Sequence, residues 1–205
     1  MAELYIKQTL MYSKVRPSYP EELFNFITPK TPCHDLVWDV GTGSGQAAKS
    51  LEFAAKVPNV RYMHTSAKMS MSEIETKIGA ESSVDLVTSA QAMHWFDLPT
   101  FYPQVKWLLK KPNGVTVSWC YTMPQVNNSV DTIFEKFDIV VDGCDHNGPF
   151  EFKIEKVMDL DSFFIYLKSW SAYQTAKEKG VELLSEDFVD KFTSAWNEDG
   201  KCEKK

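Results

Sequence analysis

Residues 35–45, with the sequence DLVWDVGTGSG, decide the fold of this chain. They begin with an apolar run of strand length, which stops at three closely spaced glycines, Gly41, Gly43 and Gly45. Helix-forming residues follow over 46–56. The pattern therefore predicts a buried strand, a tight glycine turn and a helix, which is the unit from which parallel sheets are built.

The chain up to about residue 121 continues this alternation. Further buried strands are expected over 59–64, 84–89 and 114–121, with a helix over 101–110 between the last two. The alternation predicts an α/β protein with a mostly parallel sheet covered by helices on both faces. In such a sheet the ligand lies at the carboxyl ends of the strands.

The C-terminal part of the sequence has a different pattern. A strand is expected over 150–157, followed by one amphipathic helix over 162–179. A last helix is expected to begin at Ser185, a good N-cap residue. The polar end, 197–205, is expected to fray.

Length and composition predict one globular domain. The chain has 205 residues, of which 43% are hydrophobic and 24% charged. Its net charge of −6 disfavours nucleic acid and anionic membranes as partners and favours a small molecule. We expect a single domain with three parts. Residues 1–30 would form N-terminal cap helices, with helical segments at 4–12 and from Pro20. Residues 31–125 would form a ligand-binding core, and residues 126–205 an acceptor-side part.

The cysteines indicate a reducing compartment and no metal site. Cys33, Cys120, Cys144 and Cys202 form no C-x-x-C pair and have no histidine at metal-ligand spacing, so they are expected to be free thiols. The first 14 residues lack the apolar core of a secretory signal. We therefore expect a cytoplasmic protein that holds no metal.

The glycine turn selects among ligand classes by its spacing. A P-loop requires a lysine that is absent from this turn, and a dinucleotide fingerprint requires its third glycine at position 46, which is Gln46. Asp39 stands two residues before Gly41. A carboxylate there would repel a pyrophosphate but attract the cationic, amine-bearing tail of S-adenosylmethionine. The turn therefore favours a methyl donor, and a nicotinamide-dependent dehydrogenase is the weaker reading.

Three segments resemble motifs of the class I, type 11 methyltransferases. The acid-x-Gly-x-Gly-x-Gly pattern of 39–45 resembles the first motif of that family, YSKVRPSYP at 12–20 resembles its N-terminal Y-x-x-x-R-P-x-Y-P segment, and AQAMHWF at 90–96 resembles the loop after its fourth strand. WSAYQTAKEKG at 170–180 is similar to plant members related to trans-aconitate methyltransferase. The resemblance implies a Rossmann-like fold, with S-adenosylmethionine as cofactor and S-adenosylhomocysteine as product.

The resemblance also implies which residues bind the cofactor. Asp39 would order the amino-acid end of the cofactor, or else pair locally within the turn. Arg16 would neutralise a carboxylate of the cofactor or the acceptor, or else form a surface ion pair. The full set of expected cofactor-binding residues is Tyr12, Arg16, Asp39, Gly41, Thr42, Gly43, Gly45, Ser66 and Gln91.

The acceptor side is expected to include one histidine and three aromatic residues. His94 could take a proton from the acceptor, because an unperturbed imidazole has a pKa of about 6.5. A carboxylate acceptor needs no base, and His94 would then shape the pocket. Trp95, Trp170 and Tyr173 are expected to contact the substrate, although the helical spacing of Trp170 and Tyr173 also fits a buried helix face.

The chain departs from the family pattern at three places. The interval between Gly45 and Asn59 holds one helix only, so the second strand and its ribose-binding acid have no counterpart, and Glu52 is a poor substitute. A longer segment is expected near 137–141, and a final antiparallel strand after Lys205. These segments are either deleted or belong to a longer protein.

These considerations predict an enzyme that methylates a small molecule, on oxygen, with a carboxylate as the favoured acceptor. The alternative is a catalytically weak or inactive methyltransferase-like binding protein. The missing ribose acid favours this alternative.

Overall fold

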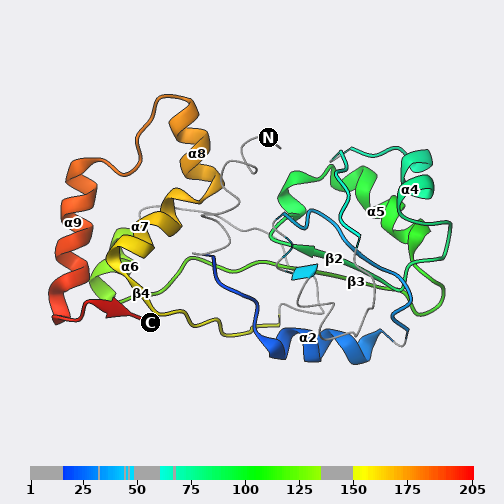
Figure 1. Ribbon diagram of the computed structural model, residues 1–205, viewed down its shortest axis with the longest axis horizontal. Helices are drawn as coiled ribbons and strands as arrows, with labels where there is room; N and C mark the ends of the chain where they lie inside the picture. The colour runs from blue at the N-terminus through cyan, green and yellow to red at the C-terminus, as the bar shows by residue number, and fades with distance from the viewer. Residues whose placement is uncertain are drawn as a thin grey trace. The chain divides into compact units, whose positions relative to one another are not determined.

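The computed structural model describes residues 16–31, 33–43, 45, 47–48, 61–66, 68–134 and 150–205. These residues fall into two compact units, whose elements are labelled in Figure 1. The core unit comprises Tyr19–Tyr121, and the second unit joins the N-terminal segment up to Ser18 with Thr122–Lys205. The expectation of a single domain stays a prediction.

The core unit is built on a parallel three-stranded sheet in the order β1-β2-β3. The strands are β1 (Val37–Asp39), β2 (Leu86–Ala90) and β3 (Val115–Trp119). Asp39 pairs with Thr88, and Ala90 pairs with Trp119, so the carboxyl ends of the strands lie at one edge. The predicted α/β fold with a parallel sheet is confirmed.

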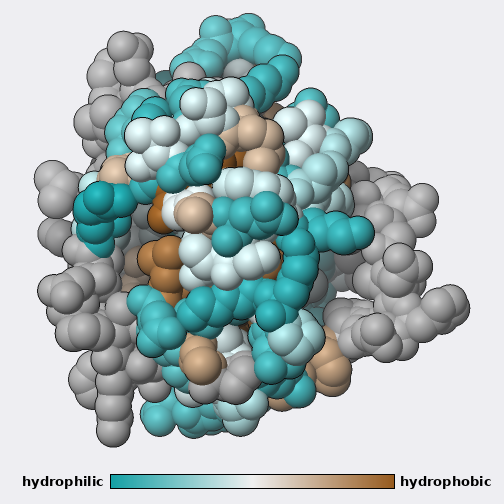
Figure 2. Space-filling view, turned by 90° about the vertical axis from the view of Figure 1, so that its right-hand side faces the viewer, coloured by the Kyte–Doolittle hydropathy of each residue, from teal (hydrophilic) through white to brown (hydrophobic). Residues whose placement is uncertain are grey.

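Helices cover both faces of this sheet. Figure 1 shows α4 (Met71–Lys77) and α5 (Leu98–Leu108) on one side and α2 (Glu21–Ile27) on the other. Two short 3-10 helices, η1 (Thr28–Lys30) and η2 (Met93–Trp95), complete the unit. The core between α4, α5 and the strands is apolar, with Ile74, Val84, Val87, Phe101, Val105 and Leu108 all buried. On the face that Figure 2 shows, hydrophilic residues predominate and hydrophobic residues form only small areas.

The buried carboxylate of Asp85 holds the segment that leads into β1. The Asp85 side chain is 4% exposed, and its Oδ1 lies 2.8 Å from Lys110 Nζ. Its Oδ2 accepts hydrogen bonds from the backbone N–H groups of Asp35 and Leu36, both at 3.0 Å. Burial by itself raises the pKa of Asp85, but Lys110 and the two N–H groups together hold it below its usual value.

The second unit is helical and has an aromatic core. Its elements are α6 (Asn128–Phe134), β4 (Met158–Asp159), α7 (Leu160–Lys168), α8 (Ser171–Glu178), α9 (Glu186–Trp196), η3 (Asn197–Asp199) and β5 (Glu203–Lys204). The buried side chains of Val130, Phe163, Tyr166, Leu167, Phe192 and Trp196 form one cluster. The predicted N-cap is confirmed, because Ser185 Oγ accepts from the Phe188 N–H. None of the helices formed by the described residues is long and apolar enough to cross a membrane.

Two predicted strands are not found where they were expected. Residues 61–64 belong to no strand, whereas 59 and 60 lie outside the described residues. In a doubly wound sheet, the third strand pairs with the second, and no second strand is predicted from the sequence between Gly45 and Asn59. Residues 150–157 are irregular, and strand pairing begins only at Met158, which is opposite Lys204. The prediction of a strand over 150–157 is therefore wrong.

Two helical predictions are corrected as well. The helix expected over 162–179 is two helices, because Trp170 adopts an extended conformation between α7 and α8. The tail expected to fray instead forms η3 and the strand β5, which is antiparallel to β4. The helix expected over 4–12 lies outside the described residues, as does most of the helix after the glycine turn.

Candidate functional site

The glycine turn lies directly after β1 and contacts the loop after β2. Gly41 has a φ of +72°, a conformation that favours glycine. A Cβ at Gly41 would lie 2.6 Å from Ala92 Cβ and 3.2 Å from Phe96 Cζ. The absence of a side chain at Gly41 therefore allows the 90–96 loop to approach the turn. Two of the three segments that carry the family resemblance thus meet at the carboxyl edge of the sheet.

Asp39 is the buried acid of this edge. Its Oδ1 accepts a hydrogen bond from Thr88 Oγ1 at 2.8 Å. Its Oδ2 is buried and has no hydrogen-bond partner among the described residues. Burial raises the pKa of the Asp39 carboxyl, and the nearby hydroxyls of Thr42 and Thr88 partly offset this effect. A cation or an N–H donor at Oδ2 would compensate the carboxylate for its lost hydration.

Other buried polar atoms without partners gather near the same edge. Within the described part of the chain, seven buried side-chain nitrogen or oxygen atoms lack a hydrogen-bond partner. Two of them, in Thr31 and His34, precede β1. The other five lie at the carboxyl end of a strand or shortly after it: Asp39 Oδ2, Thr42 Oγ1, Ser89 Oγ, Gln91 Nε2 and Trp119 Nε1. Each such atom typically costs about 1–3 kcal/mol, and these five lie at the edge where ligands of parallel sheets bind.

Gln91 combines an unpartnered side chain with an unusual backbone. Its φ is +56°, in the left-handed region, which typically costs a non-glycine residue about 1–2 kcal/mol. The Gln91 N–H donates to the Trp119 carbonyl at 2.9 Å, which ties the start of the loop to the end of β3. Such backbone strain clusters at functional sites.

His94 and Trp95 lie on η2 within this loop. His94 is exposed, and its ring centroid lies 4.5 Å from that of Trp95. Partial desolvation lowers the pKa of His94 below its usual value, so the imidazole is mostly neutral at neutral pH. Among the described residues, no carboxylate pairs with His94.

Ser66 also belongs to the core unit. It is exposed, and its Oγ accepts a hydrogen bond from the Lys68 N–H at 3.1 Å. This turn leaves its hydroxyl hydrogen free to donate to a ligand.

The remaining predicted residues belong to the second unit or lie outside the described part. Tyr12 lies outside the described residues. Tyr173 is buried, and its hydroxyl donates to Glu182 Oε2 at 3.0 Å. Trp170 is half-buried at the start of α8, and Arg16 contacts the C-terminal end of α7. The roles assigned to all these site residues stay predictions.

The residues at the sheet edge fit S-adenosylmethionine. Oδ2 of Asp39 offers a buried acceptor for the ammonium group of its amino-acid end. The turn beside it leaves room for a ligand, since a Cβ at Gly43 would have no neighbour nearer than 4.0 Å. Gln91 Nε2 is a free donor for a ligand oxygen.

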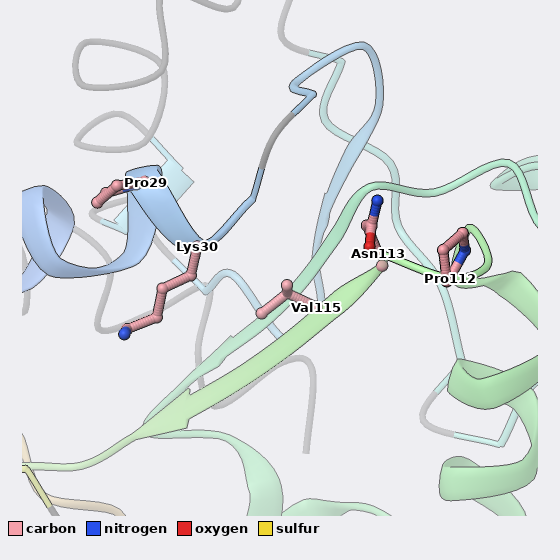
Figure 3. A pocket seen from close by; sticks show the side chains of 6 residues that line it. Pro29, Lys30, Pro112, Asn113 and Val115 are labelled. Atoms are coloured by element: carbon pink, nitrogen blue, oxygen red, sulfur yellow. The ribbon is translucent and has the colours of Figure 1, made fainter.

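A shallow cavity elsewhere in the core unit offers no comparable chemistry. Figure 3 shows its lining residues, which include Lys30 after α2 and Asn113 and Val115 at the amino end of β3. None of the buried unpartnered atoms of the described residues belongs to this lining. Ligands of parallel sheets bind at the carboxyl ends of the strands, so no function is assigned to this cavity.

Sequence reasoning missed three residues of the site. Thr88, Ser89 and Trp119 lie at the carboxyl edge, and Thr88 is the hydrogen-bond partner of Asp39. A signal was available for two of them, because Thr88 and Ser89 are hydroxyl residues at the end of an otherwise apolar strand. The position of Trp119 opposite Ala90 depends on strand register, which the sequence does not specify.

Comparisons with known proteins identify the family. A Dictyostelium discoideum protein whose name assigns it to the methyltransferases is 31% identical over 205 residues, covering 79% of this chain and 74% of that protein. A Saccharomyces cerevisiae protein named as an S-adenosylmethionine-dependent methyltransferase is 33% identical over 136 residues, covering 56% of this chain but only 45% of that protein.

A solved structure from Anaeromyxobacter dehalogenans, named as a type II methyltransferase, shares the fold. Its TM-score is 0.64 with 24% identity, and the match covers 92% of this chain and 96% of that chain. No family model matches the chain. The predicted enzyme class is nevertheless confirmed by the Dictyostelium relative, and the predicted cofactor is the one that the name of the yeast relative gives: the chain belongs to the methyltransferases.

Proposed function

We propose that this methyltransferase acts on an oxygen atom of a small molecule, and that a carboxylate is the favoured acceptor. The observation that carries this choice is the state of His94, which is exposed and has no carboxylate partner among the described residues. A general base is normally oriented by a third group. An acceptor that is already ionised at neutral pH needs no such base. The net charge of −6 supports a small acceptor rather than nucleic acid.

The proposed roles divide between binding and alignment. When bound, S-adenosylmethionine supplies a methyl group that its sulfonium has already activated. Asp39 holds the amine end with Oδ2, the glycine turn lets the backbone approach, and Gln91 donates a hydrogen bond from Nε2. Trp95 shields the site from water, and His94 donates a hydrogen bond to the acceptor. Alignment and exclusion of water are then the main contributions of the protein.

We also propose a compartment and a closer family relation. The exposed thiols of Cys33, Cys120 and Cys202 are free, which supports a reducing compartment such as the cytoplasm. The segment 170–180 supports a relation to the plant relatives of trans-aconitate methyltransferase.

Calorimetry and a methyl-transfer assay test the proposal. The full chain is titrated with S-adenosylmethionine and S-adenosylhomocysteine, and absence of binding to both would contradict the cofactor site. Radiolabelled S-adenosylmethionine is then offered with a panel of mono-, di- and tricarboxylic acids, each beside its amide and its alcohol. We expect base-labile methyl esters on acids only. Transfer to alcohols would contradict the carboxylate preference, and binding without transfer to any compound would favour the methyltransferase-like binding protein.

A further inference from the structure

The two arginines of the chain both donate to helix C-terminal carbonyls. Arg61 Nη2 donates to the carbonyl of Lys77, the last residue of α4, at 2.8 Å. Arg16 Nη2 donates to the carbonyl of Ser169, the C-cap residue of α7, at 2.9 Å. A cation is favourable at this end of a helix, where the dipole is negative. Arg16 therefore contributes to the structure of the second unit.

Arg16 completes the hydrogen bonding at the junction between α7 and α8. Ser169 is buried, and its hydroxyl both accepts from Arg16 Nε at 3.1 Å and donates to the Tyr166 carbonyl at 2.6 Å. The next two carbonyls, of Leu167 and Lys168, accept from the Trp170 N–H and from Gln174 Nε2. The carbonyl of Ser169 accepts from Arg16, so all four carbonyls at this helix end are satisfied.

The same guanidinium lies over the Tyr166 ring, which packs against Trp170. Arg16 Cζ is 5.5 Å from the centroid of the Tyr166 ring, a geometry in which cation and ring attract each other. Tyr166 in turn meets Trp170 edge to face, with ring centroids 5.5 Å apart. Arg16 thus contacts both the backbone next to Trp170 and the ring against which the indole packs. Lysine cannot reproduce this arrangement, because it lacks the planar fork of donors.

We propose that Arg16 is a positioning residue that fixes the α7–α8 junction and, through Ser169 and Tyr166, the orientation of the Trp170 ring. Its importance for methyl transfer rests on the proposed function, in which Trp170 contacts the acceptor. Its effect on the Trp170 ring does not depend on that function. This role differs from the expectation that Arg16 neutralises a carboxylate of a ligand.

Fluorine NMR on the full chain tests the placement of the ring. The protein is labelled with 5-fluorotryptophan, and Trp170→Phe identifies the Trp170 signal among the six tryptophans. We expect Arg16→Ala to shift or broaden that signal, Arg16→Lys to restore it only in part, and Ser169→Ala to move it in the same direction. Arg61→Ala is the matched control, because it removes the other helix-capping arginine, and it should leave the Trp170 signal unchanged.

An unchanged Trp170 signal in Arg16→Ala would overturn the proposal. If Arg16→Ala does not fold, Ser169→Ala decides, since it removes a single hydroxyl from the same contact. Titration with S-adenosylhomocysteine separates this role from ligand binding. We expect affinities of the wild type and Arg16→Ala within about twofold, whereas a loss of about tenfold with an unmoved Trp170 signal would make Arg16 a cofactor ligand. Failure of the wild type to bind would contradict the proposed function and leave the NMR result valid.

Discussion

Asp39 and Thr88 are direct neighbours across β1 and β2, and Thr88 Oγ1 donates to Asp39 Oδ1 at 2.8 Å. The second carboxylate oxygen of Asp39 is buried without a hydrogen-bond partner among the described residues. The pairing therefore satisfies half of a buried carboxylate. This arrangement destabilises the ligand-free fold and at the same time prepares Oδ2 for a cationic ligand.

Asp39→Asn should stabilise the fold and weaken the cofactor. Burial raises the pKa of Asp39 above its usual 3.8, so the folded protein holds this proton more tightly than the unfolded chain does. The protonated Asp39 carboxyl therefore contributes favourably to the free energy of unfolding at low pH, and this contribution is lost as the pH rises through the pKa of Asp39 in the folded protein. Relative to the wild type, Asp39→Asn should therefore gain more thermal stability at neutral pH than at a pH near the usual pKa of an aspartic acid. S-adenosylmethionine affinity should fall about ten- to hundredfold, as expected for a lost charged hydrogen bond.

The control for this substitution is Asp190→Asn, which removes the same charge from an exposed position on α9. It should leave the cofactor affinity measured by calorimetry unchanged. Unchanged affinity in Asp39→Asn would show that this carboxylate does not hold the cofactor.

Gly41→Ala should destabilise the protein more than Gly43→Ala. Both glycines have positive φ, +72° and +55°, which typically costs alanine about 1–2 kcal/mol. Only at Gly41 would the new Cβ also collide with Ala92, at 2.6 Å, and such overpacking typically adds about 1–3 kcal/mol. Urea unfolding of the two variants measures the difference. Equal losses would mean that contact with the 90–96 loop does not require a glycine at position 41.

Asp85→Ala should be among the most destabilising single substitutions in the core unit. It removes the partner of two backbone N–H groups and leaves Lys110 to the exposed Asp35 alone. A partly buried backbone N–H group that loses its acceptor typically costs about 1–3 kcal/mol in the free energy of unfolding. Asp35→Asn is the matched control, because its side chain is 79% exposed, and it should change stability by less than about 1 kcal/mol.

The pH dependence of the same group gives an independent check. The pKa of Asp85 is lowered in the folded protein, so its contribution is complete above the usual value of 3.8 and is lost as the pH falls through the folded pKa. Asp85→Asn should therefore unfold with a weaker pH dependence in this acidic range than the wild type. Identical acid unfolding profiles would contradict the assigned interaction.

Local patterns in the sequence were sufficient for the sheet and for part of the site. β1 and β2 were predictable because apolar runs of strand length end at turn residues, and Asp39 was singled out by its spacing from Gly41. The break between α7 and α8 was not predictable, because the contact between Arg16 and Ser169 joins residues 153 positions apart. Helical periodicity continues through Ser169 without interruption, so only tertiary contacts reveal the junction.

Replacement of His94 distinguishes a carboxylate acceptor from an alcohol. Desolvation lowers the pKa of this imidazole, so it is neutral at neutral pH and would be able to act as a base if the acceptor required one. General-base catalysis typically contributes about 10²–10⁴-fold. If the acceptor is a carboxylate, as proposed, His94→Gln should lower kcat by less than about tenfold. The pH profile of kcat/KM should then be flat, in the wild type as in the variant, through the range in which an imidazole titrates. Gln retains a donor at this position, and His64→Gln, which alters another exposed histidine of the core unit, is the control for nonspecific effects. A loss of more than about a hundredfold, together with disappearance of the acidic limb of the pH profile, would make His94 the general base and the acceptor a hydroxyl group.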